Sequence, residues 1–596
     1  MSNPNFRRGL ISALLCAAAS PISATEINVE DWRWNLDNVG RGGSFNLLAL
    51  DVANTSSGDF DGFISYETDA TTVASGLVFR QPLFLTKGQR TRVYFDVPLN
   101  GDINDSGLVR WGRSASQTML IDPPALATSE FADSNIDVRK TPPVVWLEPE
   151  LGTFGGAGVA KLPDRKFPTT VVSLPADGVV AVDHDPEFQQ AQRQALADWV
   201  RLGGIVVVFP PTSGDTEYSE ELAFLNVRGG GSSGRPVGMG RVLHIDRRPD
   251  DWRSKEWEEF AESMAPPRTP ITGAPSGSVA ERFGNATYRA FSSVHRPVVS
   301  WGLILTLFVV YIAAIVGGGI LVSKKTRSWK AVYGTLAMLI AGFSLVFWQI
   351  GKRGHGERSR TLTVARVDLL DGEGRARAEG WSQFFTVSSN RVAFTPADGR
   401  TAFKPRESDR SQDIRDGVDA AMERNVPGFA AASFRWQGLV DVPDVPRPTS
   451  AALDAYGELQ VEFDRPIGGA DVAAIVAGLR TDMRTSGTTA SGTPRQSPAN
   501  STSLPGLHFS DRFGTDADEL DRDRVAAAVT RGQALGLAAI ASQSSSAWRA
   551  GATGDSALVV YTVPLPPSLQ TDYGEGAGHD GFAVVRASVP ITAADP

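Results

Sequence analysis

Cysteine is almost missing from this chain: there is one among 596 residues, Cys16. It lies in a stretch that has the features of a cleaved export signal, with Arg7 and Arg8 before a short apolar run and small residues around Ala24. An uncleaved membrane anchor is the alternative. If residues 1–24 are removed, the mature chain has no thiol. This would exclude disulfide bonds, thiolate nucleophiles and cysteine-held zinc or iron–sulfur sites.

An excess of positive charge is also missing. Lysine and arginine total 58 against 67 acidic residues, which gives a net charge of −9 and a pI of about 5.4. A protein that binds nucleic acid usually carries a basic surface, so we expect no nucleic acid partner. Histidine is scarce, with six residues, and His508 and His579 lack the spacing of metal ligands. We therefore expect neither a metal site nor a bound cofactor.

Two long segments lack charge altogether. Residues 298–322 and 331–350 are apolar on every face, and each is long enough as a helix to cross a hydrocarbon core of about 30 Å. The intervening loop, 323–330, holds four basic residues and no acid, which predicts a cytoplasmic loop. The sequence thus predicts a hairpin of two transmembrane helices in the inner (cytoplasmic) membrane, with the lipid bilayer as one partner.

This topology places both large portions, 25–297 and 351–596, outside the cytoplasm. The segment after the second span is also basic, with Lys352 and Arg353 among its charges. If the second span were re-entrant, the last third of the chain would lie in the cytoplasm instead. The denser charge of the short loop favours the first arrangement.

The predicted fold class is α/β plus all-β. Alternating strands and turn clusters over 25–135 resemble an Ig-like β-sandwich, as in "FNLLALDVAN" at 45–54. Strand patterns return over 357–484 in a β-rich domain. The remaining expected segments are a juxtamembrane linker (251–297), a low-complexity linker (485–505) and a C-terminal α/β segment (506–596).

Between the sandwich and the membrane, residues 140–250 predict a flavodoxin-like, doubly wound domain. "GVVAVD" at 178–183 and "GIVVVF" at 204–209 are continuous apolar runs, as in parallel strands buried on both faces. The helix between them is expected to begin at Asp185 as N-cap with Pro186 at the first position, and to end at Gly203.

The run "LPADGVVAVDHDPEFQQAQRQALADWVRLGGIVVVF" resembles the class I glutamine amidotransferase-like domain of certain exported bacterial membrane proteins. Enzymes of that fold use a cysteine nucleophile oriented by histidine and glutamate. The lone cysteine of this chain is in the leader, so the resemblance implies an inherited scaffold without glutamine hydrolysis.

His184 and Asp185 follow the first apolar run, where doubly wound sheets place ligands. They are the weak candidates for a binding site, and no catalytic residue is assigned. The sequence predicts a non-catalytic, membrane-anchored envelope protein that acts as a binding or scaffold component of an envelope transport or assembly system, with other envelope proteins as partners. The alternative is an extracytoplasmic ligand sensor or hydrolase that uses His184 and Asp185 and binds a small ligand at the α/β domain.

Overall fold

The structure is a computed structural model of the full chain. It describes residues 26–121, 144–247, 301–353, 359–493 and 556–593, with short gaps inside these ranges, and isolated residues between 255 and 291. The expected leader and most of the juxtamembrane linker lie outside the described residues, as does the low-complexity linker beyond residue 493.

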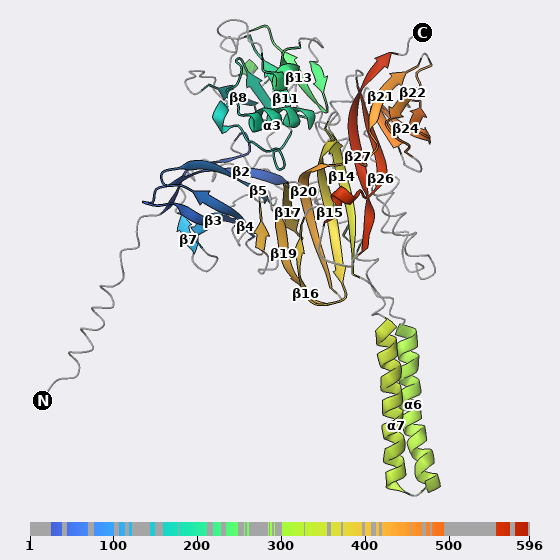
Figure 1. The fold of residues 1–596 in the computed structure, drawn as a ribbon. Helices are drawn as coiled ribbons and strands as arrows, with labels where there is room; N and C mark the ends of the chain where they lie inside the picture. Colours follow the sequence, from blue (N-terminus) through green and yellow to red (C-terminus); the bar gives the residue numbers. More distant parts are fainter. Residues whose placement is uncertain are drawn as a thin grey trace, which may run out of the picture.

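The described part is mostly β, with 52% strand and 22% helix. It has four sheets, with 3, 6, 7 and 11 strands. Two long helices extend away from the β-rich body as a hairpin (Figure 1). They are α6 (Trp301–Thr326) and α7 (Trp329–Arg353).

A three-stranded and a seven-stranded sheet hold the strands of the first hundred residues. The three-stranded sheet has the order β1 (Ile27–Trp34), β2 (Phe45–Asn54), β5 (Arg90–Pro98). The seven-stranded sheet has the order β16 (Asn390–Phe394), β19 (Ala421–Val426), β18 (Asp413–Arg415), β4 (Val78–Leu85), β3 (Phe60–Glu67), β6 (Leu108–Gly112), β7 (Thr118–Ile121).

The seven-stranded sheet therefore joins the two halves of the chain across the hairpin. Strand β4 pairs in parallel with β18, from Val78 opposite Asp413 to Arg80 opposite Arg415. Residues of both halves share one apolar core, as Phe79 and Ile414 illustrate. The expectation of a self-contained N-terminal sandwich is wrong, because its second sheet is completed by strands that follow the hairpin.

The eleven-stranded sheet contains most of the second half. Its order is β17 (Thr401–Pro405), β20 (Ala430–Asp441), β15 (Arg375–Thr386), β14 (Arg360–Leu369), β27 (Gly578–Ala593), β21 (Pro448–Leu453), β22 (Leu459–Phe463), β25 (Thr489–Gly492), β24 (Leu479–Ser486), β23 (Val472–Val476), β26 (Ser556–Pro564). An additional pairing of β26 with β27 closes the last seven strands into a barrel. Closure removes the free edges that these strands would otherwise expose.

The six-stranded sheet lies in residues 144–244. Its order is β12 (Arg235–Val237), β13 (Gly240–His244), β11 (Ile205–Val208), β10 (Val179–Val182), β8 (Val144–Glu148), β9 (Ala160–Pro163). The two apolar runs of the sequence form β10 and β11, which pair in parallel as expected.

The doubly wound, flavodoxin-like fold expected for this region is nevertheless wrong. A doubly wound sheet is covered by helices on both faces. In the described part of residues 144–247, α3 (Gln190–Arg201) is the one α-helix, beside the short 3₁₀ turns Asp164–Lys166 and Glu220–Leu225. The apolar surface around α3 packs against strands of the β-rich body, with Val200 in the same cluster as Leu47 and Val584. Strands of the β-rich body thus cover this side of the six-stranded module, where a doubly wound fold would have further helices.

Candidate functional site

His184, a candidate from the sequence, lies just beyond the carboxyl end of β10. Its Nδ1 is 2.9 Å from the Asp183 Oδ1 atom, and its Nε2 is 2.9 Å from the Asp164 Oδ2 atom. The Asp164 oxygen also accepts a hydrogen bond of 3.1 Å from the backbone N–H of Glu187. Asp164 is 3% exposed, so the imidazole is held against a buried carboxylate. Both ring nitrogens are used within the protein.

The two carboxylates favour the charged form of His184. Burial lowers the pKa of His184, but hydrogen bonds to Asp164 and Asp183, together with their negative charges, outweigh it and raise the pKa to about 9. At neutral pH the ring is therefore a doubly donating imidazolium. A general base needs an unprotonated nitrogen that faces its substrate, and this histidine offers none. His184, Asp164 and Asp183 thus form an ionic link between the 3₁₀ turn at Asp164 and the end of β10, which we call the His184 staple.

Asp185 does not take part in this staple. Its side chain is largely exposed to solvent. The part that is buried is enough to raise the pKa of the carboxyl above its ordinary value. Its expected role as helix cap is also wrong, because α3 begins at Gln190 with Gln189 as N-cap. Residues Pro186 to Gln189 are not helical, and Phe188 packs on Phe167 with ring centroids 5.0 Å apart. This aromatic contact explains why the helix begins later than the sequence indicates.

Sequence reasoning missed the two carboxylates that hold His184. Asp183 is the immediate neighbour, so the order Asp183, His184, Asp185 could have signalled a charged histidine. Asp164 is twenty residues away in a turn, with no spacing rule to connect it to the histidine. Tyr218 lies near Asp183 and Asp185. Burial is the main cause that raises the pKa of the Tyr218 phenol, and the negative charges of these two acids add to it. Its phenol therefore stays neutral.

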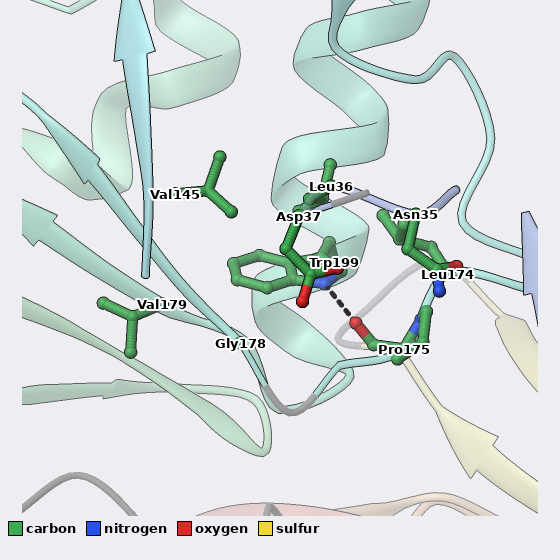
Figure 2. A pocket seen from close by; sticks show the side chains of 9 residues that line it. All are labelled: Asn35, Leu36, Asp37, Val145, Leu174, Pro175, Gly178, Val179 and Trp199. Carbon is green, nitrogen blue, oxygen red and sulfur yellow. Dashed lines mark hydrogen bonds between the residues drawn. The ribbon is translucent and has the colours of Figure 1, made fainter. Parts of the chain in front are cut away.

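A hollow lies at the opposite end of β10, near the amino ends of β8 and β10 (Figure 2). Its cavity volume is about 10 Å³, far below the roughly 300–1,000 Å³ of pockets that bind drug-sized ligands. Its wall is formed by nine residues: Asn35, Leu36, Asp37, Val145, Leu174, Pro175, Gly178, Val179 and Trp199.

Two of the polar side chains around this hollow, Trp199 and Asn35, make structural contacts. Trp199 donates its indole N–H to the carbonyl oxygen of Pro175 at 2.9 Å. Asn35 adopts a positive φ of 49°, and its side chain bridges to Asn46 and to the backbone N–H of Leu47. The hollow thus marks the seam between the six-stranded sheet and the first strands. In the described residues no group of three or more histidine, cysteine or acidic side chains could hold a metal ion.

Comparison with protein-family models gives no match to this chain, and comparison with curated proteins gives none either. Among solved structures, a cycloisomaltooligosaccharide glucanotransferase from Paenibacillus sp., solved with cycloisomaltoheptaose, is 9% identical and is matched over 70% of each chain. Its TM-score is 0.16, so this likeness carries no argument about fold or function.

Proposed function

We propose that this chain is a non-catalytic, membrane-anchored envelope protein that serves as a binding or scaffold component of an envelope transport or assembly system. The observation that carries the proposal is the single β-rich body built from both halves of the chain, with the apolar hairpin extending from it (Figure 1). Both helices are long and apolar enough to cross a membrane, with mean hydropathies of 2.5 and 1.8. Such a body presents large surfaces for partner proteins beside a bilayer.

The orientation belongs to the same proposal. The basic loop between the helices lies in the cytoplasm, and both large portions lie outside it, at the inner (cytoplasmic) membrane. Pairing of β4 with β18 supports this arrangement, since strands in one sheet must lie on the same side of a bilayer. The bond from Arg400 Nε to the buried Asp96 Oδ2 atom, 2.7 Å long, supports it in the same way.

Labelling of single cysteines tests this orientation. With Cys16→Ser as background, Lys87→Cys and Tyr456→Cys place thiols at exposed positions of the two halves, and Lys325→Cys places one in the basic loop. We expect a membrane-impermeant maleimide to label the first two in cells and the third after the membrane is opened. Labelling of Lys87→Cys without Tyr456→Cys would contradict the proposal, because the halves would then lie on opposite sides.

The scaffold role is tested by affinity capture of the tagged full chain from detergent-solubilised membranes after cross-linking. We expect defined envelope proteins in stoichiometric yield, and the same partners with His184→Ala, since His184 has an internal role. The alternative is a ligand sensor or hydrolase at His184 and Asp185. It would be supported instead by turnover of an ester, amide or glutamine substrate that is lost in His184→Ala, or by thermal stabilisation with a specific metabolite.

A further inference from the structure

Three lysines lie at the tip of the hairpin, which is the end farthest from the β-rich body (Figure 1). Helix α6 ends at Thr326 and α7 begins at Trp329, so only two residues connect the helices. Lys324 and Lys325 are in the last turn of α6, and Lys330 is in the first turn of α7. These three residues, which we call the tip lysines, are therefore carried by helix ends and not by a long loop.

The tip lysines are exposed, and the hairpin holds no acid that could neutralise them. The sequence has no acidic residue between Glu281 and Glu357. Helix α6 has 26 residues, which span about 39 Å at 1.5 Å per residue, so the acids of the body are out of reach. The described part of the protein therefore leaves the positive charge of these lysines without an ion pair.

Two aromatic rings beside the tip lysines favour a particular depth in a bilayer. Trp329 and Tyr333 are one turn apart on α7, and they are 67% and 65% exposed. Their ring centroids are 5.8 Å apart at an angle of 77°, and the Lys330 Nζ atom lies 5.9 Å from the Trp329 ring centroid. Tryptophan and tyrosine favour the headgroup level, because one end of the ring system is apolar and the other is polar. In a membrane-spanning hairpin, the tip lysines therefore lie level with lipid phosphates.

The apolar helices determine what surrounds these lysines. Neither apolar window is buried inside the described protein, at 0% each, so lipid covers both windows in a bilayer. Lys324 follows the last apolar residue of its run, Val322, by two positions, which is about 3 Å along the helix, and Lys330 directly precedes Ala331. The ammonium groups thus cannot lie far from the hydrocarbon surface. Phosphate oxygens of lipid headgroups are the anions found at that level.

We propose that the tip lysines bind the headgroups of anionic phospholipids, with Trp329 and Tyr333 as interfacial anchors. Each ammonium group donates hydrogen bonds to phosphate oxygens, and each lysine contributes about a fivefold preference for an anionic over a zwitterionic lipid. Because the lysines are exposed, this preference weakens as the salt concentration rises. The inference rests on the proposed membrane anchoring and adds the class of lipid that the hairpin selects. In the proposed topology these lipids belong to the cytoplasmic leaflet.

Quenching of a fluorophore by brominated lipid measures this preference at the tip. With Cys16→Ser as background, Ser323→Cys carries the fluorophore at an exposed position beside Lys324. The full chain is reconstituted into vesicles of phosphatidylglycerol and phosphatidylcholine in equal parts, with bromine on one lipid or on the other. The two quenching efficiencies give the relative association of the lipids with the tip. We expect phosphatidylglycerol to be preferred about tenfold or more at low salt, and less at high salt.

The triple variant Lys324→Gln, Lys325→Gln, Lys330→Gln should lose the preference. A matched control removes the same charge from exposed residues outside the hairpin, with Lys87→Gln, Lys255→Gln and Arg391→Gln. Its quenching should equal that of the wild type. Absence of a preference in the wild type overturns the proposal, as does an equal preference in the triple variant of the tip. Loss of the preference on addition of inorganic phosphate at constant ionic strength would assign the lysines to free phosphate, which also overturns it.

Flotation with vesicles of phosphatidylcholine alone separates this inference from the proposed anchoring. The wild type and the triple variant of the tip should both float, because the apolar helices and not the lysines hold the chain in the bilayer. A wild type that floats but shows no preference for phosphatidylglycerol overturns the lipid site alone. A wild type that does not float overturns the anchoring as well.

Discussion

His184 makes the stability of this protein depend on pH. Its pKa is raised from 6.5 in the unfolded chain to about 9 in the fold, so the staple contributes fully below pH 6.5. Its contribution falls as pH rises towards 9, by on the order of 1–2 kcal/mol at this partly exposed site. We expect the free energy of unfolding to decrease over that range, measured by denaturant titration. His184→Gln should flatten the profile; an equally steep profile in this variant would contradict the assignment.

Gly240 is required by a close approach of backbone. A Cβ atom at this position would lie 2.0 Å from the carbonyl oxygen of Val200 and 2.3 Å from that of Gly204. We expect Gly240→Ala to destabilise the protein by about 2 kcal/mol or more, because backbone atoms must move. At Gly58 a Cβ atom would meet nothing within 4 Å, so Gly58→Ala should melt close to the wild type. Equal melting temperatures for the two variants would refute this.

At the scale of elements, Gln192 ties helix α3 to the turn before it. Its side-chain amide donates to the carbonyl oxygens of Arg165 and Phe167 at 3.1 and 2.7 Å, and its Oε1 accepts from the backbone N–H of Gln189. We expect Gln192→Ala to cost about 1–3 kcal/mol, since buried carbonyls lose their donor. Gln190→Ala is the control, because Gln190 is exposed on the same helix, and this variant should melt close to the wild type. Thermal unfolding of both variants measures the difference.

The elements that the sequence predicted well are those with a strong local pattern. The uncharged runs became α6 and α7, and "GVVAVD" and "GIVVVF" became paired parallel strands. The start of α3 could not be predicted, because Asp185 and Pro186 satisfy the usual capping rule while Phe188 is fixed by a distant ring. The contact of Asp164 with His184 was missed for the same reason, because it joins residues that are far apart in the sequence and meet only in the folded protein.

At the scale of the whole molecule, no pattern in the sequence indicated that the two halves combine. Pairing of β4 with β18 depends on a sheet edge that neither segment reveals by its composition. The covering of α3 by strands of the body is equally non-local, and it is why a parallel strand pattern led to a wrong expectation of a doubly wound fold. Local periodicity predicts elements, whereas partners between distant elements are chosen by packing.

Arg400 connects the halves and should be costly to replace. It is bonded to Asp96 Oδ2 and to the carbonyl oxygen of Tyr94, and Asp96 is fully buried. Arg400→Gln should cost about 3–5 kcal/mol, because a buried carboxylate would lose its partner. The exposed pair of Arg391 with Glu423 should be worth no more than about 1 kcal/mol, so Arg391→Gln is the control. Similar losses in both variants would show that Arg400 is not a link.

The same architecture predicts that the chain survives a cut between α6 and α7. A specific protease site placed in the basic loop should give two fragments that remain together during gel filtration in mild detergent. They share a sheet through β4 and β18 and a core that spans both halves. Separation of the fragments without denaturant would contradict this. Uncut protein with the same inserted site provides the reference elution volume.

The shared sheet also sets an order of events during synthesis. Strand β4 leaves the ribosome more than three hundred residues before β18, and the hairpin is made in between. Until then its pairing edge is open, and an unpaired edge is a template for aggregation. In the proposed topology, a nascent chain that stalls after α7 would therefore display an adhesive strand outside the cell membrane. Quality-control proteases or holding chaperones of that compartment would be needed for each molecule during the interval.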